Sequence, residues 1–133
     1  LPGRGALHMT FGGPGEPLHV ILLHLALGRR TRMRQLVYVA NLVAPFEHVV
    51  VMGDLNCPAD SPEIRALLER TNLAEPILRA PTYPSWRPVR PLDHILVSTS
   101  LQVVSSEALD YPVSDHLPVA MELLLPDAVT LVP

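Results

Sequence analysis

The sequence contains no lysine, since all ten of its basic residues are arginine. Its formal net charge is −3, which argues against attachment to nucleic acid or to an anionic membrane through bulk positive charge. Proline, with 15 residues, is more than twice as frequent as its usual share of about 5%. These biases indicate the base composition of a GC-rich genome more than they indicate a function.

Cysteine is also scarce. Cys57 is the only one, so the chain has no internal disulfide and its composition implies no oxidising compartment. No apolar stretch is long enough to span a membrane, and no signal peptide is visible. We therefore expect a cytoplasmic protein without stable membrane insertion. A length of 133 residues with 48% hydrophobic residues is enough for the core of one domain.

The hydrophobic pattern predicts an α/β fold with a mixed sheet and helices on one of its faces. Expected strands cover residues 4–11, 18–25, 48–52, 92–97, 103–109 and 118–125, and expected helices cover residues 29–43 and 62–70. Asp60 or Ser61 would cap the second helix, with Pro62 in its first turn. A proline-rich loop is expected over residues 75–91 and a frayed tail over residues 126–133.

Asp54 and Asn56 follow the apolar run of residues 49–52, in the tetrapeptide Gly53-Asp54-Leu55-Asn56. Side chains two positions apart on a strand point to the same side, so both would face one ligand if the extended chain continues that far. Glycine ahead of them permits a sharp turn or a close backbone approach. By itself, however, this tetrapeptide is explained as well by an ordinary turn.

Two Asp-His pairs, Asp93-His94 and Asp115-His116, also lie beside predicted strands. Carboxylates and imidazoles at strand ends are suited to metal-assisted or general acid–base hydrolysis. The alternative is that the histidines cap strands and the acids are solvated turn residues. Three polar groups of this kind beside three predicted strands favour a hydrolytic site.

Several motifs occur in an order and spacing that resemble the endonuclease/exonuclease/phosphatase superfamily, which includes deoxyribonuclease I and the exonuclease III-type repair enzymes. The motifs are Gly53-Asp54-Leu55-Asn56, Pro81-Thr82-Tyr83-Pro84, Leu92-Asp93-His94-Ile95-Leu96-Val97 and Ser114-Asp115-His116-Leu117-Pro118. Upstream, Leu23-His24-Leu25 and the pair Arg34-Gln35 resemble a strand end and a helix of the same family. The resemblance extends over residues 18–125 and is nearest to small bacterial members.

The resemblance implies cleavage of a phosphate ester by in-line attack of water. Asp54 would orient or deprotonate that water, and Asn56 would donate a hydrogen bond to the phosphoryl oxygen. His116 would contact the phosphate, with Asp93 orienting its ring, and His24 would be a second histidine facing the phosphate. These roles suit the side chains, because an ionised carboxylate only accepts hydrogen bonds while an amide can donate to an oxyanion.

The resemblance also implies a divalent cation, Mg²⁺ or Mn²⁺, near Asp115. Family members usually have about twice this length, and their first half supplies a metal-binding glutamate that has no counterpart here. Glu16 and Glu47 are the nearby acids, but neither lies in a matching context. We therefore expect residues 1–133 to be a single partial domain, the C-terminal half of a four-layered α/β sandwich. Its uncovered sheet face would be exposed or used for homodimerisation.

Three further side chains are candidates for substrate binding. Arg34 lies in a basic cluster at the start of the first predicted helix. It would either contact a phosphate or lie on a solvated face of that helix. Tyr83 and Trp86 lie in the proline-rich loop, where they would stack on a base or a lipid group, or simply anchor the loop.

Three functions agree with this pattern. The first is a metal-dependent phosphodiesterase that acts as a nuclease. The second is a phosphatase or phospholipid phosphodiesterase acting on a small phosphorylated substrate. The third is an inactive half that lacks the metal-binding glutamate and assembles through its uncovered sheet face.

Overall fold

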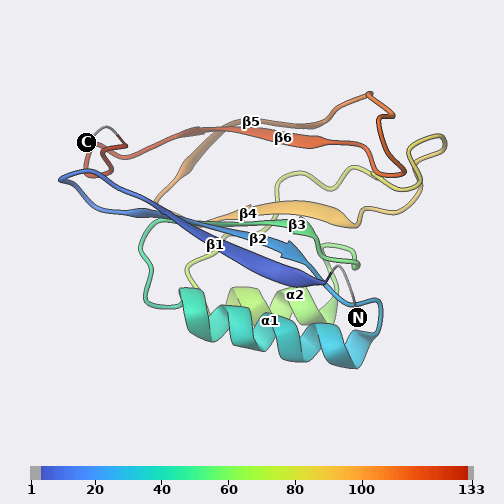
Figure 1. Cartoon of the computed structure of the whole chain (residues 1–133), viewed down its shortest axis with the longest axis horizontal. Coiled ribbons are helices and arrows are strands. Elements are labelled where there is room, and N and C mark those ends of the chain that lie inside the picture. The colour runs from blue at the N-terminus through green and yellow to red at the C-terminus, as the bar shows by residue number, and fades with distance from the viewer. Residues whose placement is uncertain (1–3, 132–133) are drawn as a thin grey trace.

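The computed structural model describes residues 4–131, which form three layers (Figure 1). The middle layer is a four-stranded sheet of β1 (Gly5–Phe11), β2 (Leu18–His24), β3 (Val49–Asp54) and β4 (Asp93–Val97). Helices α1 (Arg29–Val43) and α2 (Pro62–Glu69) cover one face. The hairpin of β5 (Gln102–Ala108) and β6 (Val119–Leu124) lies over the other. The predicted α/β fold, with a mixed sheet and helices on one face, is confirmed.

The order of the sheet is β1-β2-β3-β4. Strands β2 and β3 are parallel and joined by α1, whereas β1 pairs with β2 and β4 pairs with β3 in the antiparallel direction. Because β2 and β3 run in parallel, their carboxyl ends meet at the same rim of the sheet. Strand β4 begins at that rim, so polar residues from three strands are brought together there.

The core on the helical side is continuous and apolar. Its fully buried members include Ile21 and Val51 from the sheet, Leu36 from α1 and Ile64 from α2. Helix α2 starts as its sequence predicts, because the Ser61 side chain accepts a hydrogen bond from the N–H of Ile64 and Pro62 occupies the first turn. Burial of one face of each helix against the sheet holds the two layers together.

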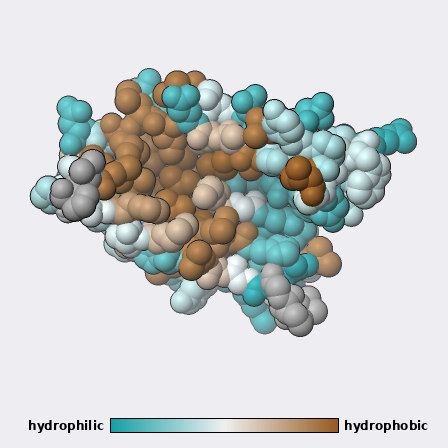
Figure 2. All heavy atoms as spheres, turned by 45° about the horizontal axis from the view of Figure 1, so that its top comes forward, coloured by the Kyte–Doolittle hydropathy of each residue, from teal (hydrophilic) through white to brown (hydrophobic). Residues whose placement is uncertain are grey.

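A second apolar cluster lies between the sheet and the hairpin. Its buried members include Leu18, Val50, Ile95 and Val97. The hairpin covers only part of this face, because Leu7, Phe11 and Leu22 remain between 42% and 54% exposed. Figure 2 shows the resulting broad apolar area on the hairpin side.

The segment after β6 is not frayed over residues 126–131, contrary to the sequence-based expectation. The N–H groups of Gly13 and Glu16 donate to the carbonyls of Thr130 and Ala128, each at 2.7 Å, and Val129 is buried. The turn between β1 and β2 thus supplies donors that the local sequence of the segment does not reveal. The last two residues of the predicted tail, 132–133, lie outside the described part of the chain.

Candidate active site

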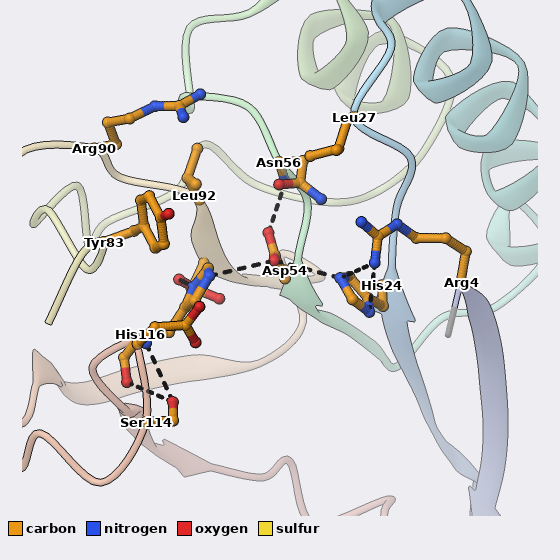
Figure 3. A pocket seen from close by; sticks show the side chains of 12 residues that line it. Arg4, His24, Leu27, Asp54, Asn56, Tyr83, Arg90, Leu92, Ser114 and His116 are labelled. Atoms are coloured by element: carbon orange, nitrogen blue, oxygen red, sulfur yellow. Dashed lines mark hydrogen bonds and ion pairs between the residues drawn. The ribbon is translucent and has the colours of Figure 1, made fainter. Parts of the chain in front are cut away.

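Three polar side chains stand next to one another across the rim where β2 and β3 end. In the strand register, His24 is opposite Asp54 and Asp54 is opposite Asp93. Strand alternation places all three on the hairpin side of the sheet, the side of Val50 and Ile95. His24 Nε2 lies 3.6 Å from Asp54 Oδ2. Figure 3 shows Asp54 between His24 and His116.

Asn56 reaches the same group through a turn rather than along a strand. Its backbone has φ 52°, a left-handed conformation that Asn tolerates, so the extended chain ends at Asp54. The Asn56 N–H donates to Asp54 Oδ1 at 3.0 Å, and its side-chain amide donates to the carbonyl of Leu25 at 2.7 Å. One N–H of the amide is therefore used inside the protein, and the second has no hydrogen-bond partner within residues 4–131.

The buried His94 ring supports the turn that carries Asn56. The ring is 1% exposed, and its Nε2–H donates to the carbonyl of Cys57 at 2.7 Å. Burial lowers the pKa of His94, so the ring is neutral and acts as a fixed donor. The Leu55 N–H adds a bond to the carbonyl of Leu92 at 2.9 Å. The residue beside Asp93 thus has a structural contact and does not face the cavity.

His116 is oriented by Asp93. Its Nδ1–H donates to Asp93 Oδ2 at 2.7 Å, which leaves Nε2 pointing toward Asp54 Oδ2 at 3.7 Å. The Thr82 hydroxyl donates to the same oxygen of Asp93 at 2.5 Å. The Tyr83 ring covers the imidazole at a centroid distance of 4.8 Å. Hydroxyl, carboxylate and imidazole therefore form one chain of hydrogen bonds.

The loop that carries His116 is fastened to the proline-rich loop. Ser85 donates twice, through its N–H to the carbonyl of Asp115 at 2.8 Å and through its hydroxyl to the carbonyl of Ser114 at 2.5 Å. The Leu117 N–H donates to the carbonyl of Thr82 at 2.8 Å. These bonds join residues 29 to 35 positions apart, so they orient the imidazole through tertiary contacts.

The two titratable groups facing each other have shifted pKa values. Partial burial, the largest influence, and the charge of Asp93 raise the pKa of Asp54, against the opposing effect of the Asn56 N–H and the imidazoles. Burial also disfavours a charge on His116. The hydrogen bond to Asp93 and the surrounding carboxylates outweigh it and raise the pKa of His116. Asp54 is thus a stronger base than an ordinary carboxylate, and His116 holds its proton more firmly than an ordinary histidine.

These groups line a cavity of about 520 Å³. Arg4 bounds one side, where its guanidinium lies 2.7 Å from His24 Nε2, and Arg90 bounds another (Figure 3). The side chains of Leu27 and Leu92 supply apolar wall. The cavity thus combines two guanidinium groups, two imidazoles and several carboxylates, a composition that suits a small anion together with a cation.

Most of the residues singled out in the sequence lie at this cavity. Its lining includes His24, Asp54, Asn56, Tyr83, Asp93, Asp115 and His116. Arg34 lines a different hollow between β1 and α1, and Trp86 is 74% exposed outside the cavity lining. The sequence did not point to Arg4 or Arg90, because neither lies in a recognised motif. Thr82 lies in the motif of residues 81–84, and that motif was the sequence signal that could have indicated its contact with Asp93.

Three side chains at the rim can offer ligand atoms to one cation. The ligand atoms of Asp54, Asp93 and His116 lie within 4.8 Å of one another. Within residues 4–131, no glutamate lines this cavity. Glu16 instead bonds to His48, which lies at the other end of the sheet just before β3 begins. The metal-binding glutamate that the family resemblance implies therefore has no counterpart at this cavity within residues 4–131.

Solved structures share this fold at low sequence identity. A conserved protein of unknown function from Enterococcus faecalis aligns with a TM-score of 0.76 and 19% identity, over 94% of this chain and 59% of that one. A mannosyl-6-phosphatase from Bacteroides thetaiotaomicron aligns with a TM-score of 0.70 and 21% identity, over 84% of this chain and 53% of that one. The inositol polyphosphate 5-phosphatase domain of SPsynaptojanin was solved with inositol (1,4)-bisphosphate and calcium. It aligns with a TM-score of 0.69 and 20% identity, over 91% of this chain and 50% of that one. The chain spans roughly half the length of these neighbours.

The fold and the cavity define an α/β protein with carboxylates, imidazoles and guanidinium groups gathered at one rim of its sheet. The sequence model of the endonuclease/exonuclease/phosphatase family matches residues 13–116. This chain therefore belongs to that family. No curated protein matches it significantly. Within residues 4–131, no helix combines the length and apolar character needed for a bilayer span.

Proposed function

We propose that this chain carries the water-activating half of a divalent-metal-dependent phosphoesterase that hydrolyses phosphodiester bonds. The observation that supports this most directly is the meeting of Asp54, Asn56, Asp93 and His116 at one cavity. A phosphoryl group in the cavity would lie among groups able to accept a proton, donate a hydrogen bond and carry positive charge. These are the three requirements for in-line attack of water on a phosphate ester.

In the proposed mechanism, Asp54 accepts the proton of the attacking water. Its raised pKa makes it a better base, while the Asn56 N–H keeps Oδ1 occupied and leaves Oδ2 for the water. The free N–H of the Asn56 amide donates to a phosphoryl oxygen. His116, protonated and held by Asp93, donates from Nε2 to another phosphoryl oxygen, and the Arg4 guanidinium adds positive charge beside His24. Each contact gains strength as negative charge builds up on the phosphoryl oxygens.

The donor set fits a hard cation in part. Mg²⁺ and Mn²⁺ favour carboxylate oxygens and water. Asp115 would hold the ion, with Asp54 as the neighbouring carboxylate, whereas Asp93 already accepts bonds from Thr82 and His116. The bound ion would neutralise phosphate charge. With few free oxygens from this chain, the remaining ligands would come from water, the substrate or a further part of the protein.

Hydrolysis of bis-p-nitrophenyl phosphate with Mg²⁺ or Mn²⁺ tests this function. The protein carrying this chain should release p-nitrophenol, and removal of the metal by EDTA should abolish the activity. His116→Ala should lower kcat by about 100-fold or more, because an oxyanion donor is lost, whereas exchange of the exposed Asp110 for Asn should have little effect. Equal rates in wild type and His116→Ala would contradict the assigned role.

A phosphatase or phospholipid phosphodiesterase acting on a small phosphorylated substrate is the second candidate. The net charge of −3 does not suit a long polyanion. Two structural neighbours are also named as phosphatases of a sugar phosphate and an inositol phosphate. Comparing rates on plasmid DNA, sphingomyelin and inositol phosphates decides between the candidates. A preference for DNA would exclude this second one.

The third candidate is a half that is inactive alone and assembles through the part of its sheet face that the hairpin leaves exposed, for example as a homodimer. The exposed apolar side chains of Leu7, Phe11 and Leu22 support it. Sedimentation of the chain tests this candidate, because a monomer that binds no apolar dye would exclude it.

The pH profile should depend on Asp93. The rate requires an ionised Asp54 and a protonated His116, so it should rise as the pH passes the raised pKa of Asp54 and fall as the pH passes the raised pKa of His116. Asp93→Asn removes the carboxylate that favours the proton on His116. The alkaline limb of kcat/KM should therefore move to lower pH, and an NMR titration of His116 should show the same shift.

The control for this experiment is again Asp110→Asn, which changes the net charge equally but lies outside the cavity lining. Its alkaline limb should coincide with that of the wild type. An alkaline limb that stays unchanged in Asp93→Asn would show that another group sets it.

A further inference from the structure

Two histidines face each other on the helical side of β1 and β2. His8 is opposite Ile21 and Thr10 is opposite His19, so the two rings are diagonal neighbours across the strand pair. His8 Nε2 and His19 Nδ1 are 3.0 Å apart. The Thr10 hydroxyl oxygen lies 3.3 Å from the His19 nitrogen and 3.5 Å from the His8 nitrogen. Three potential ligand atoms thus converge on one point.

The pair lies at the far end of β2 from the candidate active site. His19 is opposite Val49, where β3 begins, whereas His24 is opposite Asp54, where β3 ends. His8 is exposed and His19 is half-buried, so filling a core does not explain either ring. The site is therefore separate from the cavity described above.

Phe46, just after α1, holds the pair in place. The His19 ring stacks on the Phe46 ring at a centroid distance of 3.6 Å, with 7° between their planes. The His8 ring lies 5.5 Å from the same ring. One imidazole is therefore fixed before any ligand arrives, while the more exposed one can turn.

We propose that His8 and His19 form a binding site for a divalent transition-metal ion of the kind that favours imidazole, such as Zn²⁺ or Cu²⁺. Metal–nitrogen bonds of about 2.0–2.1 Å place two neighbouring ligand nitrogens about 2.9 Å apart in square-planar geometry and about 3.4 Å apart in tetrahedral geometry. The observed 3.0 Å lies within this range. A small rotation of His8 directs both lone pairs to one ion, and water, with Thr10 nearby, completes its coordination.

The surroundings of His19 favour its neutral form. Partial burial and the proximity of His8 lower the pKa of His19, so its ring is neutral near neutral pH and keeps a lone pair. The other titratable groups beside His19, in the hollow next to Phe46, are Glu16, Glu47 and His48. Glu16 is already bonded to His48. Because the two facing nitrogens share a hydrogen in the free protein, that hydrogen must move to the outer nitrogen of its own ring before both facing nitrogens can bind one ion.

A bound ion would join the edge strand β1 to β2 by coordination across the strand pair. It would also differ in chemistry from the proposed catalytic cation, because Mg²⁺ prefers oxygen ligands and competes poorly for imidazole. Excess Mg²⁺ should therefore not displace an ion from the histidine pair.

Calorimetric titration of the chain with Zn²⁺ in excess Mg²⁺ tests the proposal. The wild type should bind about one Zn²⁺ that Mg²⁺ does not displace, and His8→Ala and His19→Ala should each weaken that binding by about 10-fold or more. Loss of a residue that merely supports a ligand already costs about 10–100-fold in metal affinity. With Cu²⁺, electron paramagnetic resonance should show coupling to two nitrogens in the wild type and to fewer in either variant.

His116→Ala is the matched control, since it removes an imidazole at the other end of β2 and should leave the Zn²⁺ affinity of the His8–His19 pair unchanged. Circular dichroism verifies that each variant is folded, and nitrogen-15 NMR reports directly on the His8 and His19 rings. The proposal is overturned if Zn²⁺ does not bind, if His8→Ala binds it as tightly as wild type, or if only His116→Ala loses it.

Discussion

Replacing Asp54 with asparagine should lower kcat for phosphodiester hydrolysis by about 100-fold or more. A positioned general base contributes about 10²–10⁴-fold, and an amide cannot accept the proton of the attacking water. Asn retains the size of the side chain and the oxygen that accepts the Asn56 N–H bond. The turn should therefore survive the exchange, and the loss should appear in kcat more than in KM.

Asp110→Asn is the matched control, since it removes an exposed carboxylate outside the cavity lining and should keep wild-type kinetics. Steady-state rates on bis-p-nitrophenyl phosphate across a pH series measure the effect. The acidic limb that belongs to Asp54 should disappear in the variant. A kcat within about threefold of wild type would exclude Asp54 as the base, since general bases contribute far more.

Replacing Gly53 with alanine should destabilise the fold by about 3 kcal/mol or more. Gly53 has φ 135°, a region that costs other residues about 1–3 kcal/mol. An added Cβ would also lie 2.0 Å from the carbonyl oxygen of Leu23 on the neighbouring strand β2. Backbone cannot move aside here without disturbing the pairing that brings His24 next to Asp54. The free-energy costs of the backbone strain and of the clash therefore add.

Urea denaturation followed by circular dichroism measures this destabilisation. Gly5→Ala is the matched control, because a Cβ there meets no atom within 4 Å, and we expect a change of less than about 1 kcal/mol. If Gly53→Ala unfolds at the same urea concentration as the wild type, close backbone approach is not the reason for glycine before Asp54.

The helices were predictable because their signals are local. The spacing of Leu36, Ala40 and Val43 predicted the helix over residues 29–43, and the structure has α1 over Arg29–Val43. Ser61 and Pro62 predicted the start of α2 by capping chemistry. Each of these signals lies within a few residues of the feature it specifies, so no tertiary contact is needed to read it.

The sequence predicted which residues belong to the candidate site, but not how the chain brings them together. Strand alternation was the sequence argument for bringing Asn56 beside Asp54, but the chain leaves the strand and a left-handed turn brings the two together instead. His94 and His116 follow aspartates in the same way, yet one is buried under the turn and the other faces the cavity. Their burial depends on which layers cover each segment, and the dipeptides do not contain that information.

The amino-acid sequence alone determined the α/β pattern, the helix limits and the polar motifs at the strand ends, because these follow from periodicity, capping and residue chemistry over short spans. Tertiary structure decided which of those groups meet. The register of β2, β3 and β4 aligned His24, Asp54 and Asp93, and hydrogen bonds from the proline-rich loop oriented His116. Such contacts join residues far apart along the chain, so packing and strand pairing select them.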